Sequence, residues 1–201
     1  MRGVALAFPA LAFQALALPA LAATEDFVVE PAHTFASFAV DHLGVSTQRG
    51  RFERTAGRIV IDREAGTGSI EITIDAASVS TGNAALDAVL RSGEFFDVAR
   101  HPEVRFRARA IAFEDGVPRR ATGELTLAGV THPLDLNIVR FGCTRLPFLV
   151  RLTCGADVAA GLSRSAFGLS ALKAFVGDEV RLEIQVEAIR QEKAAVPATD
   201  G

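Results

Sequence analysis

The chain has 201 residues, a formal net charge of −3 at pH 7 and 49% hydrophobic residues. This length suits one domain with a sizeable core. A mildly acidic chain is a poor electrostatic match for nucleic acids and anionic lipid surfaces, so we expect no nucleic-acid partner. The sequence has 14 Phe but no Trp or Tyr. Phe adds apolar surface without a hydrogen-bonding group, which favours an apolar interior over a surface that stacks sugars or bases.

The N-terminal segment predicts a cleaved signal peptide over residues 1–22. Arg2 is the only charged residue before Glu25, and the apolar run between them ends in Ala20-Leu21-Ala22. That ending is the small-x-small pattern of a signal-peptide cleavage site. A transmembrane anchor is the alternative, but two prolines and a glutamine interrupt the run. We therefore expect a secreted domain over residues 23–190 and a flexible tail over 191–201.

Residues 27–30 form a short predicted strand, and residues 33–42 form a longer one. In the longer strand Phe38, Val40 and His42 alternate with polar or small residues, which places them on one face. The strand breaks at Leu43-Gly44, where glycine permits a turn, and extended structure resumes near Gly50. Phe52 then returns to the same region. An apolar face that ends in an imidazole suits an apolar cavity with one polar group at its mouth.

Two further strands are predicted over 58–62 and 69–75, and a short amphipathic helix follows over 83–92. Leu86, Val89 and Leu90 recur at helical spacing in this segment. Thr81 or Asn83 can cap its start, and Gly93 can end it. The adjacent pair Phe95-Phe96 comes next. Either at least one of them closes a cavity, or both attach the helix to the sheet.

The second half of the chain alternates at many places, which predicts antiparallel strands joined by short turns. These strands cover residues 104–109, 123–127, 134–138, 148–158 and 180–188. A row of arginines on the first of them is either a solvated face or an anion site. Counting about eight strands and one helix, we expect an antiparallel barrel, and eight strands enclose space for one small ligand.

Cys143 and Cys154 are the only cysteines, and they flank a segment with hairpin character. Two cysteines in a secreted chain predict a disulfide, here a bridge between the two strands of the hairpin. Two free buried thiols are the alternative, and would fit a reducing compartment better.

Six motifs occur in one order along residues 33–180. They are H-T-x-x-x-F-x-V-x-H-L-G-V, L-R-S-x-x-F-F-D, H-P-x-x-x-F, G-x-L-T-L-x-G-V-T, R-S-x-F-G and V-G-D-x-V. In this order they resemble the YceI-like family. The resemblance implies a lipocalin-like, eight-stranded antiparallel barrel closed by a helical segment, and a periplasmic location. It also implies an interior tunnel that holds a polyisoprenoid or another long-chain lipid, no cofactor, and frequent homodimers.

The resemblance also assigns residues to the tunnel. Those expected to line the barrel interior are Phe38, Val40, Phe52, Phe106, Leu125, Leu182 and Ile184. Those expected to close over it are Leu86, Leu90, Phe95 and Phe96. His42, Arg91, Asp97 and Arg164 are motif positions near its polar ends, and Phe167 belongs to the R-S-x-F-G motif. This chain departs from the family at Ala166, where an acidic residue is common, so Arg164 must pair elsewhere or meet a ligand head group.

A bound lipid would gain about 0.8 kcal/mol for each buried methylene, reduced by the cost of ordering the chain. Polar side chains at the mouth would then select its head group. His42 and Arg91 are our candidates, because Arg pairs with phosphate or carboxylate and His would make binding sensitive to pH. The alternative is that both side chains bond to the backbone at a strand end.

Three other functions compete with lipid binding. An enzyme lacks support, because the four histidines form no metal-binding motif and Ser165 lies in no nucleophile elbow. An outer-membrane barrel would carry aromatic girdles on an outward apolar face, and this chain has no Tyr or Trp. A non-catalytic adaptor or stress-protection module of a membrane-associated complex stays open as the alternative.

Overall fold

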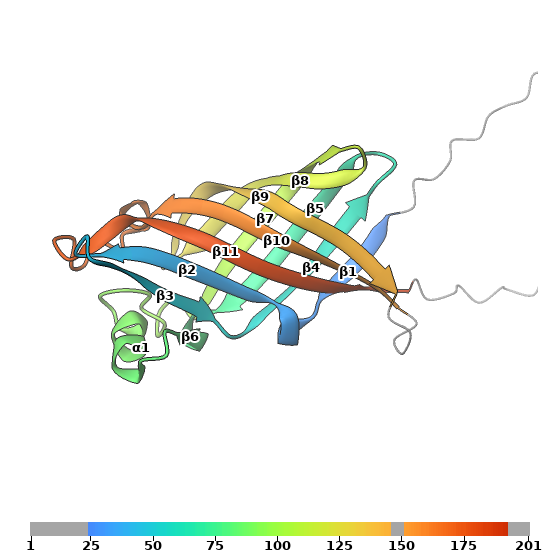
Figure 1. Ribbon diagram of the computed structural model, residues 1–201. Coiled ribbons are helices and arrows are strands. Elements are labelled where there is room, and N and C mark those ends of the chain that lie inside the picture. The colour runs from blue at the N-terminus through green and yellow to red at the C-terminus, as the bar shows by residue number, and fades with distance from the viewer. Residues whose placement is uncertain (1–23, 146–150, 193–201) are drawn as a thin grey trace, which may run out of the picture.

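The computed structural model describes residues 24–145 and 151–192 (Figure 1). Eleven strands and one α-helix make up this part of the chain. The strands are β1 (Glu25–Val29), β2 (Phe35–His42), β3 (Ser46–Phe52), β4 (Thr55–Asp62), β5 (Thr67–Asp75), β6 (Val79–Ser80), β7 (Glu103–Glu114), β8 (Val117–Leu127), β9 (Val130–Arg145), β10 (Leu152–Ser163) and β11 (Val176–Arg190). The helix is α1 (Ala84–Arg91), and three 3₁₀ turns are η1 (Pro31–His33), η2 (Ala76–Ser78) and η3 (Arg164–Phe167).

The strands form one antiparallel sheet in the order β1-β4-β5-β7-β8-β9-β10-β11-β2-β3-β6, and pairing of β1 with β11 closes it. Both β1 and β2 pair with β11, and η1 interrupts them, so together they act as one long strand. Similarly β3 pairs with β2 and β4 pairs with β1 across a bend at Glu53-Arg54. The result is the expected eight-stranded barrel, with the two-residue β6 added beside β3.

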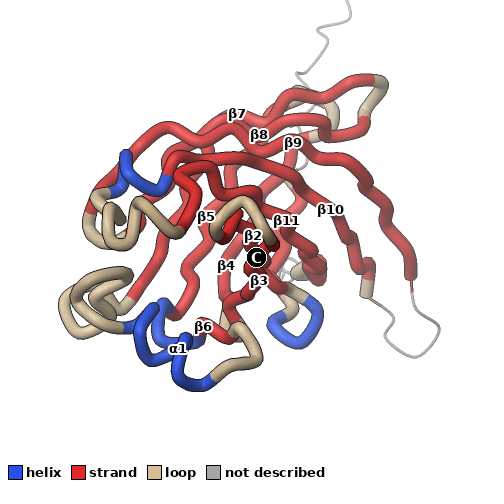
Figure 2. The backbone as a smooth tube through the Cα atoms, turned by 60° about the vertical axis from the view of Figure 1, so that its left-hand side comes forward, coloured by secondary structure: helices blue, strands red, loops and turns tan. Residues whose placement is uncertain are grey.

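Helix α1 lies at one end of the barrel, next to β6 (Figures 1 and 2). The Asn83 side chain caps it by accepting from the backbone N–H groups of Ala85 and Leu86, as predicted. At the other end Ser92, not Gly93, is the cap residue, and its hydroxyl donates to the Val89 carbonyl. The sequence placed Val89 on the apolar face of the helix, but its side chain is 41% exposed, so it does not belong to a buried face.

The carboxylate of Asp87 holds the loop before the helix in place. It is buried, and one of its oxygens accepts from both the backbone N–H and the hydroxyl of Thr81, each at 2.7 Å. The segment that runs from β6 through α1 to β7 is therefore tied down by polar contacts at its start. This segment covers one end of the barrel.

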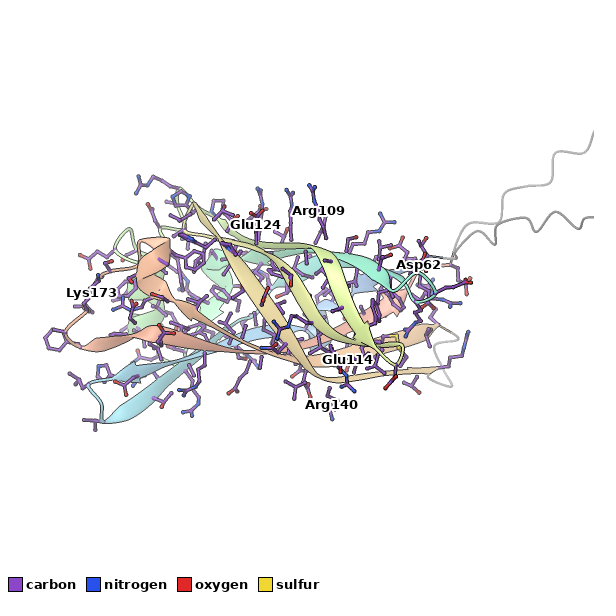
Figure 3. All side chains as sticks on the ribbon, turned by 90° about the horizontal axis from the view of Figure 1, so that it is seen from above. Asp62, Arg109, Glu114, Glu124, Arg140 and Lys173 are labelled. Carbon is purple, nitrogen blue, oxygen red and sulfur yellow. A yellow bond between two sulfur atoms is a disulfide. The ribbon has the colours of Figure 1, made fainter. Side chains whose placement is uncertain are left out.

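The turns follow the residues that predict them. Asp115 and Gly116 both have positive φ, at 50° and 74°, in the turn between β7 and β8. The break after β2 likewise places Leu43 and Gly44 at positive φ. The arginine row on β7 is exposed, and Arg109 points away from the barrel in Figure 3, which agrees with the solvated interpretation.

Several strands are longer than the sequence predicted. β3 begins at Ser46, where exposed polar side chains continue the strand without adding apolar alternation, and β4 begins at Thr55, a buried polar residue that does not extend an apolar pattern. β10 extends to Ser163, beyond the predicted end of that strand at residue 158, and η3 follows directly.

Cys143 and Cys154 are joined by a disulfide, as predicted, with a Cα–Cα distance of 4.0 Å. They pair in register across β9 and β10. The predicted signal peptide lies outside the described residues, as does the tail from residue 193. Within the described ranges, no helix has the length and apolar character needed to cross a bilayer.

Candidate functional site: an apolar cavity inside the barrel

The barrel encloses a cavity of about 270 Å³. Side chains that line it come from strands β2 to β5 and β7 to β11, since every second residue of a strand faces inward. From β5, for example, Ile70, Ile72 and Ile74 all face it. The lining is almost entirely apolar, and Thr34, Thr55 and Arg164 are its only polar or charged side chains among the described residues.

Most residues that the sequence assigned to the cavity do line it. From the barrel wall these are Phe38, Val40, Phe52, Phe106, Leu125, Leu182 and Ile184. From the closing segment they are Leu90, Phe95 and Phe96, and Arg164 joins them from η3. His42, Leu86, Arg91 and Phe167 do not line the cavity.

A chain of three phenylalanine rings joins the closing segment to the barrel wall. The Phe52 ring lies 6.0 Å from Phe38 and 5.5 Å from Phe96, centroid to centroid, in tilted geometry. On β3, a Cβ added at Gly50 would approach the Phe38 ring to 2.4 Å, so glycine is needed there. Phe95 and Phe96 both line the cavity, so they do more than attach α1 to the sheet.

Arg164 is 5% exposed, and its four hydrogen bonds all go to backbone carbonyls. The acceptors belong to Leu169, Ala171, Val176 and Gly177, at 2.5 to 3.0 Å. The guanidinium therefore fixes the loop between η3 and β11. Because position 166 is an alanine, we expected Arg164 either to pair elsewhere or to meet a ligand head group. The hydrogen bonds to backbone carbonyls are the first of these outcomes.

Asp178, in the V-G-D-x-V motif, places a carboxylate beside Ser163 and Ser165. It accepts from the hydroxyls of Ser163 and Ser165 and from the backbone N–H of Ser165. The hydrogen bond from the Ser163 hydroxyl is the main cause that lowers the pKa of Asp178, and the charge of Arg164 adds to it. Asp178 thus supplies an acid next to the R-S-x-F-G motif where Ala166 does not.

Arg91 donates to the carbonyls of Ala77 and Val79, both at 2.8 Å, and so ties the end of α1 to η2 and β6. This is the backbone-bonding alternative considered for Arg91. His42 is half-buried at the end of β2, where it pairs in register with Ser46 and Val176.

Asp97 and Phe167, which the resemblance also associated with the tunnel, lie outside the cavity lining. Asp97 forms an ion pair with Arg100 beyond the helix. Phe167 is 3% exposed and packs edge-on against His132, with ring centroids 5.2 Å apart. His132 in turn hydrogen-bonds through Nε2 to the carbonyl oxygen of Ala166 at 2.9 Å. Phe167 therefore belongs to the packed core at the end of the barrel.

Thr34 and Thr55 line the cavity and were not anticipated from the sequence. Thr34 precedes β2, and its hydroxyl donates to the Glu187 carbonyl and accepts from the Glu187 N–H. Thr55 begins β4, in phase with Ile59 and Ile61, which also line the cavity. That phase was the available signal, but the predicted strand began only at Arg58 and left Thr55 in a connection.

No group of three His, Cys, Asp or Glu side chains in the described part of the chain is arranged to hold a metal ion. The hydroxyl of Ser165, which lies in no nucleophile elbow, hydrogen-bonds to the Ser163 hydroxyl and to the Asp178 carboxylate.

The comparisons with known proteins agree with this geometry. The family model of the YceI-like domain matches residues 27–188, a range that begins within β1 and ends within β11. The chain belongs to the YceI-like family. A UPF0312 protein of Pectobacterium carotovorum is 32% identical, over 85% of this chain and 88% of that protein.

Solved structures show the same barrel. A crystal structure of the Campylobacter jejuni YCEI protein is 28% identical, with a TM-score of 0.64 over 76% of this chain and 90% of that one. A polyisoprenoid binding domain from Saccharophagus degradans, implicated in plant cell wall breakdown, has a TM-score of 0.60 over 82% of this chain and 98% of that one. Its identity is 16%, so this second likeness shows the fold alone.

Proposed function

We propose that this YceI-like protein is a periplasmic carrier that holds a polyisoprenoid or another long-chain lipid in its internal cavity, without catalysis. The observation that carries the proposal is the cavity itself, which is lined by apolar side chains from nearly every strand. The neighbour from S. degradans is described as a polyisoprenoid binding domain, which supports the same class of ligand.

The chemistry of the lining suits an aliphatic chain. Each methylene moved from water into an apolar cavity contributes about 0.8 kcal/mol, before the cost of ordering the chain is subtracted. The cavity volume of about 270 Å³ lies just below the range of pockets that bury small ligands, roughly 300–1,000 Å³. A slender, flexible chain fits such a space better than a bulky ring system.

Organic extraction of freshly purified protein, followed by mass spectrometry, tests the carrier function. We expect one long-chain lipid per protein. Ala156→Trp, which puts a large ring into the cavity lining, should lose it, and Ala159→Trp is the matched control on the same strand outside the lining. Empty wild-type protein, or equal lipid in both variants, would contradict the proposal.

The periplasmic location rests on the N-terminal segment and on the disulfide, since disulfides persist in oxidising compartments. The mass of the protein recovered from a periplasmic fraction tests it. We expect a chain that begins after Ala22 or one residue later. A full-length chain in the cytoplasm would contradict this location.

A second candidate function is a membrane-docked adaptor, and the apolar tips of two loops favour it. Leu43 and Val45 follow β2, while Leu172 and Phe175 precede β11, and all four are exposed, Val45 at 84%. The two loops are adjacent, because the Leu43 N–H donates to the Phe175 carbonyl at 2.9 Å. Lys173 projects from this end of the barrel in Figure 3.

Flotation with phosphatidylcholine–phosphatidylglycerol vesicles separates the two functions. An adaptor should float as an empty protein and should stop floating in a Val45→Ser/Phe175→Ser variant. Val139→Ser is the control, because Val139 is 65% exposed on the barrel wall. Protein that stays in solution in every form counts against the adaptor.

A further inference from the structure

At one end of the barrel, the inward faces of three neighbouring strands change from apolar to charged. On β4, Ile61 lines the cavity, and Arg63 follows two residues later, directly after the strand. On β11, Ala188 lines the cavity and Arg190 follows at the next position on the same face. Between these strands, Glu25 of β1 pairs in register with Ile61 and shares its face.

We propose that Arg63 and Arg190 bind an acidic head group of the bound lipid, a carboxylate or a phosphate, just beyond the apolar cavity. This inference rests on the carrier function and adds the chemical class of the ligand's polar end. The site lies outside the lining, so the aliphatic chain stays among apolar side chains while its head group meets the two arginines.

The site lies at the end of the barrel away from α1. β11 begins at Val176, which pairs with His42, and ends at Arg190. In Figure 3, Asp62, the residue before Arg63, lies at the opposite end from Lys173. The proposed head-group site is therefore opposite to the end where the sequence placed His42 and Arg91.

The three charged side chains form one cluster around the Glu25 carboxylate. Arg63 donates to it through Nε at 2.6 Å, and Arg190 donates to its other oxygen through Nη1 at 3.1 Å. Burial disfavours the charge on Glu25, but the hydrogen bonds from Arg63 and Arg190 outweigh this effect and lower the pKa of Glu25. Two positive charges therefore meet one negative charge, and the three side chains together attract an anion.

Arg63 connects this cluster to the cavity. Its guanidinium lies over the ring of Phe141, 5.5 Å from the ring centroid, and its Nη2 donates to the Cys143 sulfur at 3.6 Å. Phe141 and Cys154, the disulfide partner of Cys143, both line the cavity. A lipid whose chain contacts Phe141 thus has its end beside the Arg63 guanidinium.

Both guanidiniums keep donors for a ligand. Within the part of the chain that the structure describes, Nη1 of Arg63 and both Nε and Nη2 of Arg190 have no hydrogen-bond acceptor. Their side chains are 35% and 37% exposed, so an anion reaches them without losing all of its hydration. The planar fork of a guanidinium matches a carboxylate or a phosphate.

Three probes of equal chain length test the site on delipidated protein. They are palmitic acid, hexadecyl phosphate and hexadecanol, each measured by displacement of a fluorescent fatty-chain probe. We expect wild type to bind at least one of the two acids about fivefold more tightly than the alcohol, as for a good partly exposed ion pair. The acid that binds more tightly identifies the head group. Arg63→Gln and Arg190→Gln should each reduce this preference with little change in alcohol affinity.

Glu25→Gln should act in the opposite direction. It removes the carboxylate that competes for both arginines, so affinity for the preferred acid should rise while alcohol affinity stays the same. Arg58→Gln is the matched control, because Arg58 lies on β4, pairs with Asp26 and has a 62% exposed side chain. This variant should keep the preference of wild type.

The outcomes separate the site from the carrier function. Equal affinity of wild type for the acids and the alcohol would overturn the proposal and leave the carrier function intact, whereas binding of no probe would remove the carrier function as well. An equal loss of preference in Arg58→Gln would reduce the effect to general charge attraction. An Arg63→Gln variant that loses alcohol binding as strongly as acid binding would show a structural role, and either of these results would also overturn the proposal.

Discussion

The guanidinium of Arg164 is buried at one end of the barrel, and backbone carbonyls rather than a carboxylate accept its hydrogen bonds. Replacing it leaves four carbonyls without their donor, and a buried group that loses its partner is costly. We therefore assign Arg164 to the stability of the loop before β11.

We predict that Arg164→Ala lowers the free energy of unfolding by about 3 kcal/mol or more. Arg164→Lys should recover only part of this loss, because an ammonium cannot match the planar fork of the guanidinium. Urea unfolding measures both effects, with the exposed Arg109→Ala as control. Equal stability of wild type and Arg164→Ala would show that the loop is held by other contacts.

Alternation placed Phe38 on an apolar strand face, because every second side chain of a strand lies on one face. The family resemblance assigned Phe106 and Leu182 to the interior, and both line the cavity. The sequence pattern could not identify the hydrogen-bond acceptors of Arg91 and Arg164, because these are backbone carbonyls, which every residue has. Thr55 was missed for a different reason: a polar residue at the start of a strand does not extend an apolar pattern.

The carboxylate of Asp75 fixes the start of the segment that leads to helix α1 at the end of the barrel. Asp75 ends β5, caps η2 through the Ala77 N–H, and accepts from Arg54 at the bend between β3 and β4. The hydrogen bond from the Arg54 guanidinium is the main cause that lowers the pKa of Asp75 below its ordinary value of 3.8.

A lowered carboxyl pKa gives stability that is present above the unfolded value and is lost as the pH falls through the folded value. We predict that the stability contributed by Asp75 is constant from pH 7 to about pH 5 and is lost progressively as the pH falls below the ordinary carboxyl pKa of 3.8 and through the lowered one. Because the pair is partly exposed, the contribution should not exceed about 1 kcal/mol. Urea unfolding across this pH range measures it. If Asp75→Asn keeps the full acid sensitivity of wild type, other carboxylates are responsible.

The hairpin of β9 and β10 carries the disulfide, and it joins residues 11 positions apart. For a loop of this size the chain-entropy model gives about 3 kcal/mol of stabilisation. We predict that dithiothreitol lowers the melting temperature of wild type and not that of Cys143→Ser/Cys154→Ser. A reductant effect on both proteins would point to a cause other than the bridge. The sequence predicted this pairing because only two cysteines are present.

The barrel as a whole was predictable because its strands alternate and its turns are short. Asp115-Gly116 marks one hairpin, and residues 128–130 mark the next. The interruption of two long strands, by η1 and by the bend at Glu53-Arg54, could not be inferred from alternation. β1 and β2 both pair with β11, and β3 and β4 pair with β2 and β1 in turn. Only this pairing in three dimensions shows that each interrupted pair acts as one long strand.

Titration of delipidated protein with a series of straight-chain alcohols measures whether the cavity takes up an aliphatic chain. We predict that affinity rises with every added methylene, by at most about fourfold each, which corresponds to about 0.8 kcal/mol. It should then reach a plateau when the cavity is full, and the plateau should come at a shorter chain in Ala156→Trp. An affinity that is independent of chain length from the shortest alcohol onward would contradict a lipid carrier.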